Sequence, residues 1–267
     1  MKTTRRAVLA ALLLGSMSFS GCASDRAQRG DDPPRVERSV LVFGGTGQLG
    51  AEIVRRLLAS GDKVTVFARA NSDRSALAGL PVSYVIGDLI DPPSIRKAFK
   101  DGDFDLVVNA VRVEDGDTRF YEKSLGPIVE AARDARVGHF LHHGAVGAGD
   151  NAAKFTSFGW DKVPGLLDRL RDQGIGEQLI RQSGVPFTII RNSRIYPDGT
   201  PSTGRASLTE DDSVLTPMTR ADLAIFTTQC LGNVACFGRV YHINDPSLAW
   251  PPPQVQPQVQ PQPQPSR

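Results

Sequence analysis

Residues 39–50 read SVLVFGGTGQLG, and this stretch decides the fold of the chain. A valine-rich apolar run predicts a buried strand, glycines follow, and a helical pattern begins at Ala51. Strand, glycine turn and helix in this order suit a dinucleotide diphosphate, because glycines let the backbone come close and a helix start offers free N–H groups and partial positive charge. The predicted nucleotide-binding residues are Gly44, Gly45, Thr46, Gly47, Gln48, Leu49 and Gly50.

The first 38 residues are expected to lie outside the folded domain. Three basic residues precede an apolar stretch over residues 7–14, and small residues follow up to Cys22. Residues 1–22 therefore predict a signal peptide, too short to span a membrane. Its last four residues, FSGC, resemble a bacterial lipobox, so Cys22 is expected to carry lipid and to anchor an exported lipoprotein to a membrane of the cell envelope. A signal peptide that merely contains a cysteine is the alternative. Residues 23–38 are interpreted as a polar linker.

Residues 4–9, TRRAVL, also resemble a twin-arginine export signal. Such a route carries proteins that are already folded, so a bound cofactor could be loaded before export. The alternative is an ordinary basic start that happens to contain two arginines.

Between its two ends the chain is expected to form one domain with an ample core, over residues 39–248. Residues 249–267, mostly Pro, Gln and Val, predict a disordered or polyproline-like tail. The net charge of +2 is spread along the chain without a basic block, so nucleic acid is not indicated as a partner. No Cys/His grouping has metal-site spacing. Cys230 and Cys236 are compatible with a disulfide in an exported protein, and equally with two small buried side chains.

Apolar runs alternate with helical patterns along this domain. Further strands are expected at residues 64–68, 82–86, 106–110, 139–143, 187–190 and 239–243. Helices are expected at residues 51–60, 93–100, 120–135, 165–182 and 219–231. Continuous apolar strands separated by helices predict a single-domain α/β fold of the Rossmann type. Its doubly wound parallel sheet would be covered by helices on both faces and would bind its ligand at the carboxyl edge.

Residues that follow the later strands are expected to complete the cofactor site. Arg69 follows the second strand, where an acidic residue would bind the ribose of NAD and an arginine suits the 2′-phosphate of NADP. Arg74 and Ser72 are expected to assist it, so NADP(H) is the predicted cofactor. A solvated strand-end charge is the alternative for Arg69. The candidates after the third and fourth strands are Asp88, Leu89, Asn109 and Ala110.

Several of these segments resemble the atypical short-chain dehydrogenase/reductase superfamily, in its NmrA-like branch. They are the glycine turn, the arginine after the second strand, GDL at residues 87–89 and SGVPFTIIR at residues 183–191. A closer similarity is to the flavin reductase and biliverdin-IXβ reductase group. The KVP segment, SG turn, TG loop and DLA helix of that group correspond to residues 162–164, 183–184, 203–204 and 222–224. The resemblance covers most of the domain and implies a nicotinamide-dependent reductase.

The catalytic residues of classical members are missing from the matching positions. Those members use a serine after the fifth strand and a Tyr-x-x-x-Lys on the next helix. Here Gly144 and Ala145 occupy the serine region, while Arg169 and Gln173 stand at the tyrosine and lysine positions. None of these side chains is a general acid near neutral pH. His143 is a weak remaining catalytic candidate, and a strand-end histidine that faces its neighbours is the alternative.

The flavin and biliverdin reductases pass hydride to a delocalised acceptor that can take its proton from solvent, so an open apolar pocket would suffice. The expected pocket residues are Phe155, Phe158, Trp160 and Arg194. The aromatic loop either covers a planar ligand or anchors itself in the core. The predicted function is NADPH-dependent reduction of a planar acceptor such as a flavin, tetrapyrrole or quinone. The alternative is an NADP-binding redox sensor or scaffold protein without turnover.

Overall fold

The apolar runs pair into one sheet, as the sequence predicts. The computed structural model describes residues 37–113 and 119–250, and in these ranges eight strands stand in the order β3-β2-β1-β4-β5-β6-β8-β7. The strands are β1 (Ser39–Phe43), β2 (Lys63–Ala68), β3 (Ser83–Ile86), β4 (Leu106–Asn109), β5 (His139–Ala145), β6 (Phe187–Asn192), β7 (Ser207–Thr209) and β8 (Arg239–Asn244). All pairings except that of β7 with β8 are parallel.

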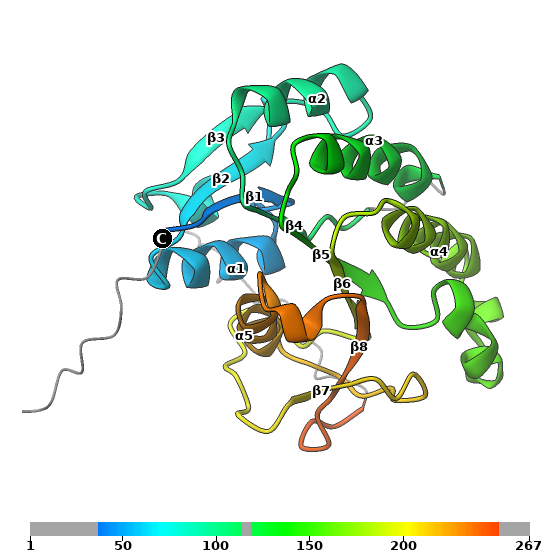
Figure 1. Ribbon diagram of the computed structural model, residues 1–267. Coiled ribbons are helices and arrows are strands. Elements are labelled where there is room, and N and C mark those ends of the chain that lie inside the picture. The colour runs from blue at the N-terminus through cyan, green and yellow to red at the C-terminus, as the bar shows by residue number, and fades with distance from the viewer. Residues whose placement is uncertain (1–36, 114–118, 251–267) are drawn as a thin grey trace, which may run out of the picture. The chain divides into compact units, whose positions relative to one another are not determined.

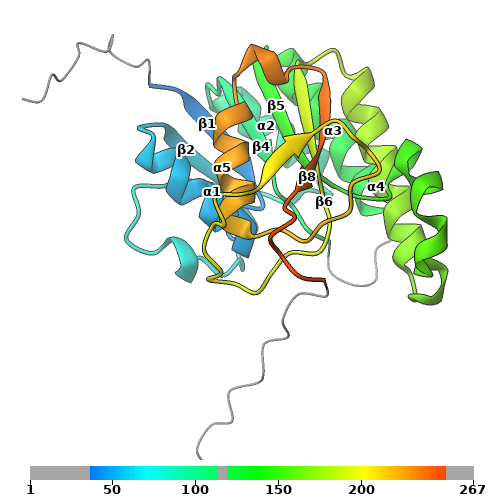
Figure 2. The same ribbon diagram turned by 90° about the horizontal axis from the view of Figure 1, so that it is seen from below.

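Helices cover both faces of this sheet (Figure 1). On one face lie α1 (Gln48–Ala59) and α5 (Arg220–Cys230), side by side in both views (Figure 2). On the other face lie α2 (Pro92–Asp101), α3 (Phe120–Asp134) and α4 (Leu166–Gln182). The predicted Rossmann-type, doubly wound α/β fold is therefore confirmed.

Alternate residues of each strand serve two separate cores. In β1, Val40 and Val42 pack into a cluster with residues of α1 and α5, whereas Leu41 and Phe43 pack into a second cluster with residues of α2, α3 and α4. Successive strand side chains point to opposite faces, so a strand covered on both sides has to be apolar throughout. This is why the first strand reads as a continuous apolar run.

One strand, β7, was not predicted from the sequence pattern. β7 has three residues, none of them fully buried, and it pairs antiparallel with β8 at the edge of the sheet. An edge strand of this length carries too few side chains to show an alternating pattern. The parallel sheet predicted from the sequence thus has one antiparallel strand at its edge.

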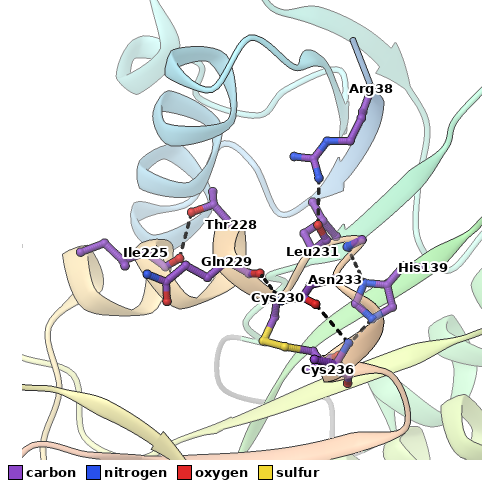
Figure 3. The surroundings of a disulfide bond; sticks show 12 residues. Arg38, His139, Ile225, Thr228, Gln229, Cys230, Leu231, Asn233 and Cys236 are labelled. Atoms are coloured by element: carbon purple, nitrogen blue, oxygen red, sulfur yellow. Dashed lines mark hydrogen bonds between the residues drawn. A yellow bond between two sulfur atoms is a disulfide. The ribbon is translucent and has the colours of Figure 1, made fainter. Parts of the chain in front are cut away.

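A disulfide joins Cys230, at the end of α5, to Cys236 (Figure 3). Of the two interpretations left open by the sequence, the disulfide is the one found. The loop that it closes packs on the amino edge of the sheet, where the Gly232 N–H donates to His139 Nδ1 at 3.0 Å and Arg38 Nη1 donates to the Leu231 carbonyl oxygen at 2.9 Å. The disulfide therefore lies at the opposite edge of the sheet from the glycine turn.

Across residues 37–113 and 119–250, no helix combines the length and apolarity that a membrane span requires. The predicted signal peptide with Cys22, most of the linker and most of the Pro/Gln-rich tail lie outside the described residues. Those interpretations remain predictions.

Candidate functional site

Three glycines of the predicted turn are required by the protein's own packing. Gly44 has φ +75°, and a Cβ there would lie 2.8 Å from the backbone of Ala110. A Cβ on Gly45 would come within 2.7 Å of Val66, and one on Gly50 within 2.0 Å of the Gly44 carbonyl oxygen. Side chains at these positions would push the helix away from the strands. Gly50 therefore lets the start of α1 touch the turn after β1, and Gly44 lets that turn touch the chain just after β4.

The start of α1 is open to an anionic ligand. Gly47 is the N-cap residue, it is exposed, and no side chain caps the helix. The first-turn N–H groups of Gln48, Leu49 and Gly50 have no partner within the helix, and no acidic residue lies in that turn. Thr46, half-buried, precedes them in the turn. Free N–H groups at a helix start suit a diphosphate, so the residues present fit a dinucleotide.

A basic turn follows β2. Arg69 is exposed, and its carbonyl oxygen accepts from the Ser72 N–H at 3.1 Å and from Arg74 Nη2 at 3.4 Å. The Arg74 guanidinium lies over the Tyr84 ring, 4.8 Å from its centroid. The three candidates predicted for the 2′-phosphate of the cofactor thus belong to one compact turn.

Asp88 and Leu89 lie just after β3. Asp88 is exposed, and its Oδ1 accepts from the Ile90 N–H at 3.1 Å while its own N–H donates to the Ser94 hydroxyl. Leu89 packs half-buried against the core on the α2 side. The Asp88 carboxylate is therefore oriented by its own turn at the carboxyl edge.

Asn109 points into the protein at the end of β4. It is 2 % exposed, its Oδ1 accepts from the Val111 N–H at 3.2 Å, and its Nδ2 donates to His142 Nδ1 at 3.1 Å. Because Nδ1 accepts, the proton of neutral His142 resides on Nε2. Burial lowers the pKa of His142 to about 3. Asn109 therefore fixes the backbone around Ala110, which packs against Gly44.

His143 faces the α5 side of the sheet. It is buried, with Nε2 2.9 Å from the Thr227 hydroxyl of α5 and Nδ1 3.4 Å from Asn192 Oδ1. Burial lowers its pKa to about 4. At neutral pH this imidazole is uncharged, and both of its nitrogens face protein groups.

The predicted aromatic loop forms one cluster after β5. Phe155 is buried and stacks on Trp160 with ring centroids 5.3 Å apart, whereas Phe158 is 53 % exposed and lies 5.9 Å from the Trp160 ring. A Cβ on Gly147 would meet Trp160 at 2.2 Å, so the indole packs directly on the chain that leaves β5. Phe155 and Trp160 anchor the loop, and Phe158 is left facing solvent.

Arg194 lies apart from this cluster in the contacts it makes. It is exposed just after β6, and its carbonyl oxygen accepts from the Met218 N–H at 3.1 Å. The backbone at Arg194 is thus fixed by the segment that precedes α5.

A buried ion pair lies beside Gly144, the position that the resemblance places in the serine region. A Cβ on Gly144 would lie 2.5 Å from Glu177 Oε1. Glu177, on α4, is paired with Arg191 of β6 at 2.6 Å, and both side chains are almost fully buried. Breaking one partner of such a pair leaves an uncompensated buried charge, so the arrangement excludes a larger side chain at position 144.

A second buried carboxylate on α4 acts across to α3. Asp172 accepts from the backbone N–H groups of Tyr121 at 2.8 Å and Glu122 at 2.9 Å, and so caps the start of α3. Two buried polar atoms, Oε1 of the adjacent Gln173 and Nε2 of His142, have no hydrogen-bond partner among the described residues. Sequence reasoning missed Asp172, because only tertiary packing brings it to α3.

The segment before α5 contains residues that a local motif could have revealed. Thr219 is the N-cap, and its hydroxyl accepts from the Asp222 N–H at 3.0 Å and donates to Asp222 Oδ2 at 2.7 Å. A threonine three residues before an acidic residue is a recognisable helix-start signal in a sequence. Asp222 also accepts from the Thr203 N–H, so it ties the loop after β6 to the start of α5.

A hollow of about 620 Å³ lies between α4 and the segment Gly149–Phe158. Its lining includes Leu167, Leu170 and Arg171 but none of the predicted cofactor residues. Within the described residues, no group of three or more His, Cys, Asp or Glu side chains could hold a metal ion.

Comparison with known proteins agrees with this geometry. A sequence profile of the NAD(P)H-binding family matches residues 44–233, and the chain belongs to that family. Sterol demethylase protein B of Methylococcus capsulatus is 40 % identical over 133 residues, which are 47 % of this chain and 40 % of that protein. The match thus spans less than half the length of this relative.

Solved structures show the same fold. One is described as ChuY, an anaerobilin reductase from Escherichia coli O157:H7, with a TM-score of 0.67 and 19 % identity over 79 % of this chain and 98 % of that one. Another is a short-chain dehydrogenase/reductase from Veillonella parvula in complex with NADP, with a TM-score of 0.63 and 14 % identity over 82 % of this chain and 99 % of that one. These likenesses show the shared fold, and with the family match they agree with the resemblance noted in the sequence.

Proposed function

We propose that this protein is an NADPH-dependent reductase that transfers hydride to a planar, delocalised acceptor without a side-chain proton donor. One observation carries the proposal. The glycine cradle of the cofactor is intact, whereas Gly144, Arg169 and Gln173 stand where the serine, tyrosine and lysine of the superfamily would be. A planar acceptor that needs no acid from the enzyme could be reduced at a site that has the glycine turn for the cofactor but lacks the usual acid residues.

The turn after β2 supports NADP(H) over NAD(H). Arg69 and Arg74 come from one turn at the carboxyl edge of the sheet, and Ser72 adds a hydroxyl. Guanidinium groups form charge-assisted hydrogen bonds with phosphate oxygens, whereas an NAD ribose is usually bound there by a carboxylate. The 2′-phosphate of NADP would thus find two cations at this position.

The residues of the chain would bind and orient the cofactor and the acceptor, and none of them would donate a proton. The free N–H groups at the start of α1 would hold the diphosphate, and Asn109 keeps the end of β4 in place beneath the ribose. Phe158, which faces solvent beside the Trp160 ring, would offer an apolar surface to a flat acceptor, and Phe155 would hold Trp160 from behind. Bound NADPH supplies a hydride, that is, a proton with two electrons. The acceptor spreads the added charge over its conjugated system and takes one proton from solvent.

The test is NADPH oxidation by the full chain, followed through the nicotinamide absorbance. FMN, a water-soluble quinone and biliverdin serve as acceptors, and a simple ketone and an aldehyde serve as substrates that require an acid. We expect turnover with at least one planar acceptor and none with the carbonyl compounds. Binding of NADPH without turnover of any planar acceptor would favour the redox sensor or scaffold instead.

We further propose that the mature chain is an exported lipoprotein, held at a membrane surface by lipid on Cys22, with the twin-arginine route as its path. The Cys230–Cys236 disulfide supports export, because such bonds persist in oxidising compartments. Mass spectrometry of the mature N-terminus decides the matter. A diacylated Cys22 is the expected result, and an unmodified chain that starts elsewhere would refute the proposal.

A further inference from the structure

Arg220 joins two parts of the carboxyl edge that are far apart in the sequence. It is the first residue of α5, and its Nη2 donates to Gln48 Oε1 at 2.7 Å while its Nη1 donates to the Tyr196 carbonyl oxygen at 2.7 Å. Gln48 is the first residue of α1, the helix that starts in the glycine turn. Tyr196 belongs to the segment between β6 and β7.

The charge of Arg220 is not neutralised by these contacts. Both oxygens that accept from it are neutral, and within the described part of the chain no carboxylate lies within 4.0 Å of its guanidinium. Burial lowers its pKa, Asp198 raises it, and Arg112 lowers it. An arginine remains protonated at neutral pH all the same. A cation with only neutral partners therefore stands at the open helix start.

We propose that Arg220 is a ligand of the cofactor diphosphate and that it links cofactor binding to the segment over residues 193–206. The inference rests on the proposed binding of NADP(H). Hydrogen bonds from guanidinium to phosphate oxygens are stronger than those to a neutral amide oxygen. The diphosphate would therefore replace Gln48 as the partner of Nη2, while Nη1 keeps the Tyr196 carbonyl.

The surroundings hold Arg220 where this role requires it. Asp222 accepts from Thr203 N–H and from the Thr219 hydroxyl, so the start of α5 and the loop after β6 share one carboxylate. The Tyr196 N–H donates to the Met218 carbonyl oxygen at 2.8 Å. The guanidinium thus sits on a fixed backbone, and an arginine held in place loses less conformational entropy on binding an anion.

Calorimetric titration of the full chain with two ligands tests the proposal. NADP⁺ contains the diphosphate, whereas adenosine 2′-monophosphate keeps the adenine and the 2′-phosphate without it. Arg220→Ala should weaken NADP⁺ binding by about 10–100-fold and leave adenosine 2′-monophosphate unchanged within about threefold. Arg96→Ala, which removes an exposed arginine from α2, is the matched charge control and should change neither affinity.

Each contrary outcome has a distinct meaning. Unchanged NADP⁺ affinity in Arg220→Ala would overturn the proposal, as would an equal loss for both ligands, which would indicate a structural role. A wild-type chain that binds no NADP⁺ would refute the proposed function itself. Should Arg220→Ala fail to fold, Arg220→Gln keeps a donor for the Tyr196 carbonyl and removes the charge, and the same selective loss is expected.

Discussion

The two halves of the carboxyl edge are built in different ways. At the ends of β1 and β4, the site is made by backbone: three glycines allow close packing of the turn, and the first N–H groups of α1 have no partner within the helix. At the ends of β5 and β6, the structure is made by buried side chains, among them the Glu177–Arg191 pair and the Phe155–Trp160 stack.

This difference explains why the first half can be recognised in the sequence and the second half cannot. A backbone site requires glycine at fixed spacings, so its signal lies within a dozen consecutive residues. A side-chain site is assembled from distant segments, and many side chains could fill the same space. We expect substitutions in the first half to act on cofactor binding and those in the second half to act on stability or the acceptor.

The largest effect is expected from Gly47→Val. A Cβ at this position has only the Gly44 carbonyl oxygen nearby, at 3.3 Å, so the ligand-free fold should tolerate it. The added side chain would occupy the space of the diphosphate at the helix start, and NADP⁺ binding should fall below detection. Calorimetry measures binding, and thermal unfolding confirms that the variant is folded.

Gly50→Val is the matched comparison. Its Cβ would lie 2.0 Å from the Gly44 carbonyl oxygen, so the turn itself must break. We expect the free energy of unfolding to drop by about 3 kcal/mol or more. If Gly47→Val binds NADP⁺ like the wild type, the assignment of the diphosphate to this helix start is wrong.

Arg69→Ala should reduce affinity for NADP⁺ by about 10–100-fold, equivalent to about 1.5–3 kcal/mol, because a charge-assisted bond to the 2′-phosphate is lost. Affinity for NAD⁺ should stay the same. Arg69→Lys, which keeps the charge without the fork, should lie between the two. Equal affinity of wild type and Arg69→Ala for NADP⁺ would show that Arg69 is a solvated charge.

The fold could be predicted from the sequence almost completely. Most of the parallel strands are covered on both faces and read as apolar runs, and helical patterns separate them along the chain. β7 could not be predicted, since its side chains are only partly buried. The strand order at β6-β8-β7 also depends on tertiary pairing that no local pattern records.

The site was predictable only where it is local. The glycine turn and the Arg69 turn each lie within a few residues of a strand end. The contact of Arg220 with Gln48 spans 172 residues of sequence, and that of Asp172 with Tyr121 spans 51. Nothing in the sequence around Arg220 or Asp172 indicates which distant residue it contacts, so these contacts are known only from the folded chain.

The buried histidines of β5 should make the stability of the fold sensitive to acid. Burial lowers the pKa of His139 to about 4, below the ordinary value of 6.5. Between these two pKa values His139 is protonated in the unfolded chain but neutral in the folded chain. The free energy of unfolding therefore falls as pH drops from about 6.5 toward 4. Between pH ~7 and ~5, His139 should account for a loss of up to about 2 kcal/mol in the free energy of unfolding.

His139→Gln separates this contribution from that of other groups. Glutamine can still bond to the Thr188 hydroxyl but does not titrate. Urea unfolding at several pH values should show a shallower pH dependence for the variant than for the wild type. Parallel curves for the two proteins would mean that His139 is protonated equally in both states.

The smallest effect is expected from His143→Ala. The imidazole is neutral and bonded to Thr227 of α5, so its removal should lower the rate of acceptor reduction by less than about tenfold. A true general acid would cost about 10²–10⁴-fold. A variant that binds NADPH normally but loses about a thousandfold in rate would make His143 the proton donor.

The central claim is hydride transfer without a side-chain acid, and its most direct test is the pH dependence of a single turnover. The full chain, loaded with NADPH, is mixed with whichever planar acceptor it reduces, and deuterated NADPH establishes that hydride transfer limits the rate. We predict a rate that stays constant within about twofold between pH ~6 and ~8, because no group of the chain gives up a proton in that step. A rate that follows one ionisation near neutral pH, and that loses this dependence in His143→Ala, would contradict the account.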